Sequence, residues 1–434
     1  MNVVRLLPVI LSALLMAAHF SRAEQHGLVA VSLMALFLLM LRQRWVAIVI
    51  QALLAAAAIE WVRTALRIIQ ARQEVGEPWT RLAIILGAVA LFMLLSAGVF
   101  RFRGLRERYA SRHPAEVTSA IVFLGTVGLL GIVQSVVALP LLLVERFFPG
   151  FGWIEIFLLG MYAQWITGKL MNPQQTLWRQ RIWLIFSIVF FAQLAFGLLG
   201  IEKMLMTGQL HLPVPAMILT GPIFRGERFF MPILFLSTII LVGPAWCSYL
   251  CYVGAWDSLA SRALKRPQRL PEWRRAAQIG ILVFMILAAI GLRFAGASML
   301  TATILGLLFG IGGVAVMVFW SRKTGQMTHC ITYCPIGVLA TWLGKASPFR
   351  IRITDSCTEC NACALVCRYH SLTKEDIRRR RPGIACTLCG DCLASCKHNS
   401  LEYRFLKMRP VRARALFIVM IVVLHTLFLG VARI

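Results

Sequence analysis

Eight cysteines between Cys357 and Cys396 carry a spacing that is typical of iron–sulfur chemistry. They form two copies of the pattern C-x2-C-x2-C-x3-C. Three closely spaced thiolates can hold three irons of a cubane cluster, and in the bacterial two-cluster pattern the fourth cysteine, expected to open a helix, ligates the other cluster. The spacing therefore predicts two [4Fe–4S] clusters. The predicted ligands are Cys357, Cys360, Cys363 and Cys396 for the first cluster, and Cys386, Cys389, Cys392 and Cys367 for the second.

Other uses of these eight cysteines fit the pattern less well. Disulfide bonds are disfavoured by the doubled motif and by the cytoplasmic setting predicted below. A zinc site uses paired C-x2-C units, not two triplets that each have a trailing cysteine. Arg368 and Lys397 stand where a proline usually follows the fourth cysteine. Since they are basic, they are expected to favour the reduced, more negative cluster and so to raise its potential.

Four further cysteines form two C-x3-C pairs, Cys247 with Cys251 and Cys330 with Cys334. Residues four apart share one face of a helix, so each pair is expected to present both sulfurs together. Both pairs are predicted at the inner ends of membrane spans. Three interpretations stay open: a third iron–sulfur or other soft-metal centre, a redox disulfide, and small buried side chains that only pack.

The elements that must position these motifs are predominantly apolar. Of the 434 residues, 59% are hydrophobic, and the mean hydropathy is +0.76. These values predict a polytopic membrane protein rather than a soluble globule. The first apolar run is interpreted as a retained helix rather than a cleaved signal peptide. The eleven predicted spans lie near 6–21, 27–41, 45–62, 82–100, 117–144, 152–168, 182–201, 230–247, 276–295, 300–320 and 413–432.

Three segments depart from simple spanning helices. The run 117–144 is long and is interrupted by Pro140, so it is expected to tilt or kink. The stretch 203–229 is apolar but rich in proline and glycine, which favours a re-entrant or surface-lying segment over a span. In the polar insert, the alternation at Phe349 to Ile353 and at Leu401 to Phe405 predicts strands, within a module of two strand pairs and two one-turn helices.

The charge distribution predicts an orientation. The chain has 45 Lys and Arg against 18 Asp and Glu, a net charge of +27, carried in short loops rather than on a polar face. The placement of the basic residues in short loops favours contacts with anionic lipid and argues against a nucleic-acid partner. With the N-terminus inside, roughly three quarters of the basic residues fall in inner segments, as the positive-inside rule requires. The cysteine-rich insert is then cytoplasmic and the C-terminus lies outside. The run Arg378 to Arg381 is either a lipid-facing loop or a docking site for an acidic electron donor.

The predicted fold class is an all-α polytopic membrane protein of about 11 helices, with a small α+β ferredoxin module of the bacterial 2[4Fe–4S] type before the last helix. The expected location is the bacterial cytoplasmic membrane. The predicted parts are an N-terminal membrane region over 1–113, a membrane core with the two C-x3-C pairs over 114–344, the ferredoxin module over 345–408, and a final helix over 409–434.

The blocks W-C-x3-C and C-x3-C-P, followed by the doubled ferredoxin pattern, resemble the membrane-integral ferredoxin-type proteins of the NapH, NosR and MauN group. The likeness covers roughly 150–405 and includes Leu210 to Arg225 and Gly243 to Asp257. Tyr252 departs from it, since many members have proline there. The resemblance implies electron transfer between the quinone pool or a cytoplasmic donor and a periplasmic redox system, and a part in maturing a partner oxidoreductase.

Three functions compete at this point. The first is an electron-transfer component of an oxidoreductase system, with a redox protein and a quinone as partners. The second is an accessory protein that reduces a metal or a thiol to mature a partner enzyme. The third is a transporter, since many spans and a broken segment suit one. The predicted clusters favour the first two, which use the same cysteines.

Overall fold

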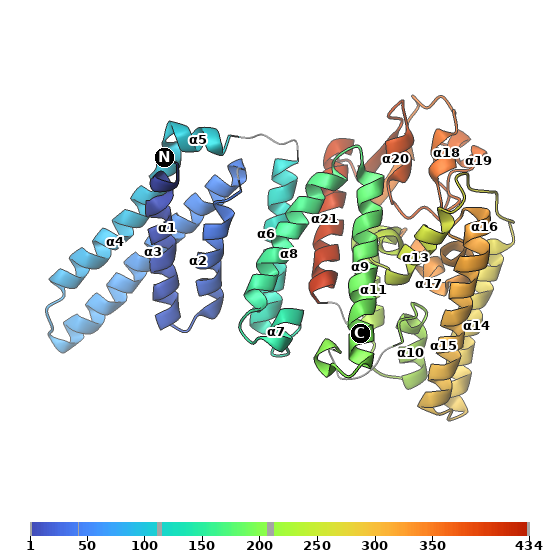
Figure 1. The fold of residues 1–434 in the computed structure, drawn as a ribbon, viewed down its shortest axis with the longest axis horizontal. Coiled ribbons are helices and arrows are strands. Elements are labelled where there is room, and N and C mark those ends of the chain that lie inside the picture. The colour runs from blue at the N-terminus through green and yellow to red at the C-terminus, as the bar shows by residue number, and fades with distance from the viewer. Residues whose placement is uncertain (1, 42, 111–114, 206–211, 432–434) are drawn as a thin grey trace. The chain divides into compact units, whose positions relative to one another are not determined.

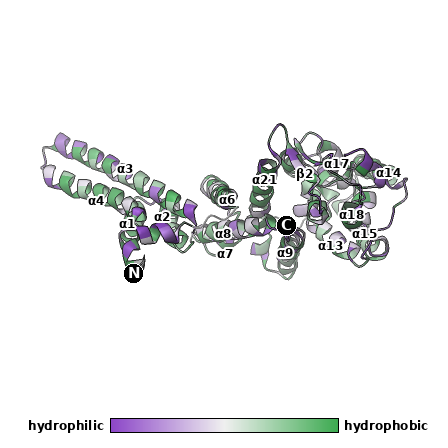
Figure 2. Ribbon diagram, turned by 90° about the horizontal axis from the view of Figure 1, so that it is seen from above, coloured by the Kyte–Doolittle hydropathy of each residue, from purple (hydrophilic) through white to green (hydrophobic). Residues whose placement is uncertain are grey.

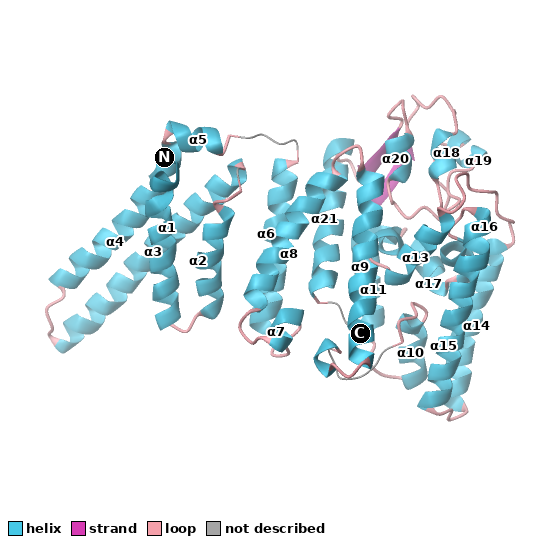
Figure 3. Cartoon of the chain, viewed as in Figure 1, coloured by secondary structure: helices cyan, strands magenta, loops and turns pink. Residues whose placement is uncertain are grey.

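Helices dominate both compact units of the chain, Met1–Met161 and Tyr162–Ile434 (Figures 1 and 3). The structure, a computed structural model, describes residues 2–41, 43–110, 115–205 and 212–431.

Nine helices among these described residues are long and apolar enough to cross a membrane. Their many exposed aliphatic side chains are the surface expected of lipid-facing helices. They are α1 (Asn2–Arg22), α3 (Arg44–Val75), α4 (Thr80–Gly98), α6 (Glu116–Val136), α9 (Gln175–Leu198), α11 (Phe230–Val242) with its continuation to Tyr249, α14 (Arg274–Phe294), α15 (Met299–Val316) with its continuation to Thr324, and α21 (Pro410–Gly430).

Two of the predicted spans differ from these nine. The run 27–41 forms α2 (His26–Leu38), which is apolar but has only 13 residues. The run 152–168 forms α8 (Gly152–Leu170), which has the length but carries Glu155 and Lys169. The predicted total of eleven spans therefore stays a prediction.

The run 117–144 does not form one continuous helix, so the expected kink within a single span is wrong, whereas its tilt stays a prediction. Helix α6 ends at Val136, six residues after the buried Leu130, and the backbone is extended at Val137. A short helix, α7 (Leu143–Phe147), follows Pro140. A helix continued through Pro140 would lack the bond to the Val136 carbonyl, because proline has no N–H to donate.

Unit 1 has one apolar core between its helices. Val46 of α3 and Met93 of α4 are fully buried, and these two long helices pack along each other (Figure 2). Leu105 closes the core from the short helix α5 (Arg103–Arg108), which follows the 3-10 turn Val99–Arg101. Helices α1 and α2 pack against each other within the same unit.

Unit 2 holds all twelve cysteines. In Figure 1, α9 and α21 run beside each other, α14 and α15 lie farther along the unit, and the ferredoxin-type module lies at one end of these helices. The broken stretch 203–229 contains a turn at Glu202–Met204 and α10 (Met217–Arg225), which packs on α14. Residues 206–211 of this stretch lie outside the described residues. The re-entrant or surface-lying arrangement therefore stays a prediction.

The module over 345–408 is built on a single antiparallel strand pair. Strands β1 (Phe349–Ile353) and β2 (Leu401–Phe405) pair with Phe349 opposite Phe405. The prediction of two strand pairs is therefore wrong, because the segment between the strands forms cysteine loops and three short helices. These helices are α18 (Ala362–Val366), α19 (Lys374–Arg378) and α20 (Asp391–Ser395).

The strand pair buries one face against the last membrane helix. Phe349, Ile351 and Tyr403 point inward, and the rings of Phe349 and Tyr403 contact Phe417 of α21, which is itself fully buried. Alternation along the strands thus fixes which face of the module meets the membrane core.

Candidate iron–sulfur sites

The structure groups Cys357, Cys360, Cys363 and Cys396 around one cavity, here called the outer site. About 340 Å³ of space inside this cavity holds no protein atoms. Ile353, Ile377 and Leu401 supply apolar walls, and they are buried in the module core. Cys360 is exposed, so this site reaches the surface of the module.

The other four ferredoxin-type cysteines line a second cavity, the inner site, with about 350 Å³ of space. Its fourth cysteine, Cys367, comes from the first motif, just as Cys396 of the second motif lines the outer site. Both ligand sets stay predictions, and this crossed arrangement of side chains supports them. The inner set is Cys386, Cys389, Cys392 and Cys367.

The two cysteine loops share the same backbone turns. Glu359 and Leu388, each two residues after the first cysteine of its motif, both have a left-handed backbone with φ of 56°. The fourth cysteines also match, since the amides of Ser371 and Ser400 donate to Cys367 Sγ and Cys396 Sγ at 3.4 and 3.3 Å. A repeated turn of this kind is costly for non-glycine residues, so its repetition points to a shared role.

The fourth cysteine does not open a helix as expected. Cys367 and Cys396 instead follow the last residues of α18 and α20, with extended backbone, while Cys363 and Cys392 lie inside those helices. Because each short helix ends before the fourth cysteine, the extended chain can carry that cysteine to the other site.

The two C-x3-C pairs come together in the membrane core, near the inner site. Cys330 interacts electrostatically with Cys247, Cys251 and Cys334, so the four sulfurs form one group, here called the membrane-edge site. Cys247, Cys251 and Cys334 are buried, and Cys330 is half-buried. All twelve cysteines of the chain are free thiols in this structure.

The expectation that each pair lies on one helical face is wrong. Cys247 lies in α12 (Trp246–Tyr249), but Cys251 is extended and precedes α13 (Tyr252–Ser261). The second pair has the same break, with Cys330 in the turn His329–Tyr333 and Cys334 before α17 (Pro335–Leu343). Each second cysteine thus stands at a helix start, where free backbone N–H groups reach its thiol.

Two glycines that sequence reasoning missed complete these turns. Gly254 and Gly337 each stand three residues after the second cysteine of their pair. A Cβ atom at Gly254 would lie 3.0 Å from the carbonyl oxygen of Cys247, and a Cβ at Gly337 would collide with that of Cys330. The signal was present as the repeated spacing C-x3-C-x2-G.

Side chains from neighbouring helices fix the carbonyl groups of this site. Trp183 Nε1 of α9 donates to the Cys251 carbonyl at 2.8 Å. The Gln278 amide of α14 donates to the carbonyls of both Cys330 and Cys334, each at 2.8 Å. These bonds hold the two turns at fixed positions between the helices.

Tyr369 lies between the inner and membrane-edge sites. It is buried, lines the inner cavity, and packs in one cluster with Cys330, Cys367 and Cys389. Cysteines of both sites thus pack against one buried cluster that contains Tyr369, so the two sites are adjacent.

Arg368, one residue earlier, does not point into a cluster cavity. Its guanidinium donates to the carbonyls of Leu264 and Gly325 at 2.9 and 2.8 Å. Where a proline was expected, this chain therefore has an anchor that ties the module to the membrane core.

Burial keeps these thiols protonated in the absence of a cation. Burial, followed by the neighbouring Cys357, raises the pKa of Cys363 to about 11. Burial raises the pKa of Cys386 to about 12, and burial with the neighbouring Cys334 raises that of Cys251 to about 12. Bound iron reverses this effect, because a cation favours the thiolate and its binding releases the protons.

The donor sets suit iron–sulfur clusters. Among the residues that the structure describes, no three or more His, Cys, Asp or Glu side chains are arranged for one metal ion. The ferredoxin-type cysteines instead surround two cavities with apolar walls, and a cluster takes four thiolates around a larger body.

Comparison with known proteins places iron–sulfur chemistry at the membrane core as well. Residues 226–271 match the model of a family described as a 4Fe–4S binding domain. The match contains α11, α12 and α13, and thus the pair Cys247 and Cys251. No curated protein and no solved structure matches the chain.

Fold and site together define a class. The chain is a membrane protein with a 4Fe–4S ferredoxin-type domain, and such a domain indicates iron–sulfur electron transfer.

Proposed function

We propose that this chain is a membrane-bound electron-transfer protein in which the outer, inner and membrane-edge sites form one ordered series. It would work between a cytoplasmic or quinone-linked donor and a membrane or periplasmic redox partner, as in the NapH, NosR and MauN group that its motifs resemble. The observation that carries the proposal is the buried cluster that contains Tyr369, because cysteines of both the inner and the membrane-edge site pack against it.

The chain's own residues would give the series its order. Cys360 brings the outer site to the module surface, where a redox partner has access. The outer and inner sites exchange their fourth cysteines, so they are neighbours by construction. Iron–sulfur clusters bound at these positions would supply one-electron chemistry, while the buried walls exclude water and lower the local dielectric.

The membrane-edge site is needed if electrons are to enter the membrane. A hydrocarbon core of about 30 Å separates a module at one surface from a partner at the other. Cys247 lies within the candidate span Phe230–Tyr249, and the 4Fe–4S family match falls on the pair that it forms with Cys251. We therefore assign a third iron–sulfur centre to Cys247, Cys251, Cys330 and Cys334.

Cluster content and reducibility test the proposal together. Protein purified without oxygen should contain about eight iron atoms and about eight acid-labile sulfides for the two ferredoxin-type sites, and about twelve of each with the third. In membranes, a quinol or a low-potential cytoplasmic donor should reduce these centres. Zinc in place of iron would contradict the proposal. Normal clusters that no donor reduces, with a partner enzyme losing its metal on deletion of this chain, would favour the accessory function instead.

A further inference from the structure

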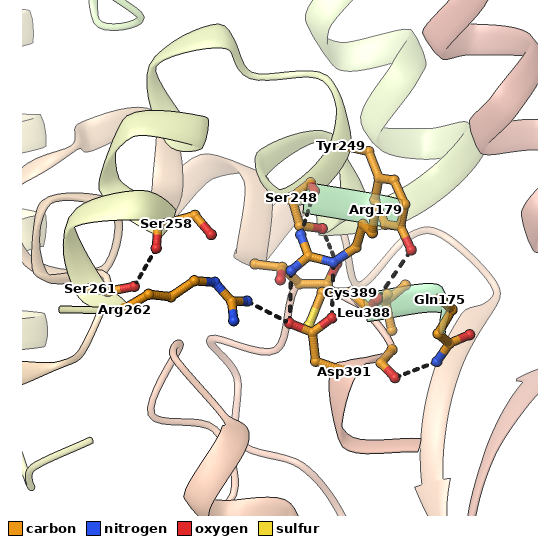
Figure 4. A network of polar contacts seen from close by, with 12 residues as sticks. Gln175, Arg179, Ser248, Tyr249, Ser258, Ser261, Arg262, Leu388, Cys389 and Asp391 are labelled. Atoms are coloured by element: carbon orange, nitrogen blue, oxygen red, sulfur yellow. Dashed lines mark hydrogen bonds and ion pairs between the residues drawn. The ribbon is translucent and has the colours of Figure 1, made fainter. Parts of the chain in front are cut away.

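The membrane core holds the loop of the inner site by hydrogen bonds to four of its residues, Thr387, Cys389, Gly390 and Asp391. Ser248 Oγ donates to the Thr387 carbonyl at 3.0 Å, Tyr249 Oη to the Cys389 carbonyl at 3.0 Å, and Gln175 Nε2 to the Gly390 carbonyl at 2.7 Å. Figure 4 shows Ser248, Tyr249 and Gln175 around the loop that contains Leu388, Cys389 and Asp391. Ser248 and Tyr249 lie between Cys247 and Cys251, so the membrane-edge turn itself holds the inner loop.

Arg179 joins the two sites through one guanidinium. Its Nε and Nη2 atoms donate to the two carboxylate oxygens of Asp391 at 2.9 and 2.7 Å. Its Nη1 donates to the Ser248 carbonyl at 3.0 Å, next to Cys247. Asp391 lies between Cys389 and Cys392 of the inner set. Both side chains are almost fully buried, at 3% and 7% exposed.

The formal charges of the ion pairs around Asp391 do not cancel. Asp391 is also 3.4 Å from Arg262 Nη2, so one carboxylate faces two guanidinium groups (Figure 4). The charges of Arg179 and Asp391 both reach the Cys389 thiol. A protein interior screens charges far less than water does, so these buried charges act strongly on a redox group at the inner site.

The outer loop has no equivalent arrangement among the contacts that the structure describes. Its bonds come from the module itself, with Arg380 donating to the Cys357 carbonyl at 3.2 Å and Asn361 to the Glu359 carbonyl at 2.8 Å. Arg380 and Glu359 form a partly exposed pair at 3.5 Å. The two sites thus have matching loops in different electrostatic settings.

From these contacts we propose that Arg179 is a positioning residue that holds the inner loop on the membrane-edge turn and raises the reduction potential of the inner site above that of the outer one. This inference rests on the proposed function, because it requires clusters at both sites. A positive charge favours the reduced, more negative state, so electrons arriving at the outer site would move inward.

The test compares Asp391→Asn with the double variant Arg179→Gln/Asp391→Asn, by redox titration of the two ferredoxin-type EPR signals. Neither variant contains the carboxylate, so their difference reports the removal of Arg179, that is, of its charge and of its bond to Ser248. We expect Asp391→Asn to shift the inner midpoint to more positive values and the double variant to reverse that shift. The outer midpoint should stay fixed in both. Arg181→Gln is the matched control, since Arg181 is exposed on the same helix over Trp178.

Hydrogen exchange gives a second readout that does not depend on potential. The amides of residues 387–391 should exchange faster in the double variant than in Asp391→Asn, since the bond from Arg179 to Ser248 is also lost. Loss of only the inner EPR signal in the double variant would support the positioning role. The inner midpoint of Asp391→Asn, compared with that of the wild type, would then test the effect of the buried charges on the inner site.

Three outcomes would overturn the inference. These are equal inner midpoints in the two variants, equal shifts at both sites, or the same shift in Arg181→Gln. Wild-type protein without two ferredoxin-type signals would instead overturn the proposed function, and the inference with it.

Discussion

Cys367 is the residue that most sharply separates the two ferredoxin-type sites. It belongs to the first motif in sequence but lines the inner cavity with Cys386, Cys389 and Cys392. Its Sγ atom accepts from the Ser371 amide, so its place is set by local backbone as well as by the cavity.

Replacing Cys367 with Ser should therefore damage the inner cluster and spare the outer one. We expect roughly four fewer iron atoms per chain and loss of one of the two ferredoxin-type EPR signals. Cys396→Ser is the mirror control, which should remove the other signal. Loss of the same signal in both variants would contradict the crossed ligand sets.

The membrane-edge cysteines can be tested in the same way. The double variant Cys251→Ser/Cys334→Ser should keep both ferredoxin-type clusters, lose roughly four iron atoms, and stop electron transfer to the membrane partner. Iron analysis, EPR and quinol-dependent reduction measure these effects. Normal electron transfer would eliminate the third centre. An activity loss that a thiol oxidant rescues, with unchanged iron, would favour a redox disulfide.

At the scale of elements, the broken helices around the C-x3-C pairs determine the site. Each first cysteine lies inside a short helical turn and each second cysteine precedes a new helix. The amides of Cys251 and Cys334 donate to the carbonyls of Trp246 and His329 at 3.0 and 2.8 Å. The turn brings the carbonyl of the first cysteine close to the glycine in the next helix.

Gly337→Ala should disrupt this turn. The added Cβ would meet the Cys330 carbonyl, and backbone cannot move as a side chain can. We expect a loss of about 1–3 kcal/mol in unfolding free energy, typical of overpacking, and a weakened membrane-edge centre. Gly280→Ala in α14 is the control, because nothing lies within 4 Å of a Cβ there. Thermal unfolding and iron content measure the two effects, and equal behaviour of both variants would refute the role of Gly337.

At the scale of the whole molecule, the module is joined to the last membrane helix. Strand β2 packs on α21, which begins at Pro410, five residues after β2 ends, and has the length and apolarity to cross the bilayer. A single crossing then separates the module from the C-terminus, whatever the number of spans before it.

Reporter fusions test this orientation. Alkaline phosphatase joined near Arg380 should be inactive and joined after Ile434 active, because the excess of basic residues predicts a cytoplasmic module. Immunoblots should show equal amounts of both fusions. Activity at Arg380 with none after Ile434 would reverse the proposed sidedness.

The sequence alone determined the features that depend on spacing and composition. The repeated C-x2-C-x2-C-x3-C pattern predicts two four-cysteine sets, since cluster geometry fixes ligand spacing. The long apolar runs predict membrane helices, because a bilayer requires about 20 such residues. The alternation in β1 and β2 likewise follows from the pleat of a strand.

Only the tertiary structure decided which distant residues meet. Arg179 and Asp391 are more than two hundred positions apart, and no local pattern pairs them. Helical spacing predicted that Cys330 and Cys334 share one helical face. In the structure, the helix breaks before Pro335 and the bonds from Gln278 hold the resulting turn. Such contacts depend on packing between helices, which a periodic sequence signal does not encode. The cluster that joins Tyr369 with Cys330, Cys367 and Cys389 is for this reason a property of the folded chain.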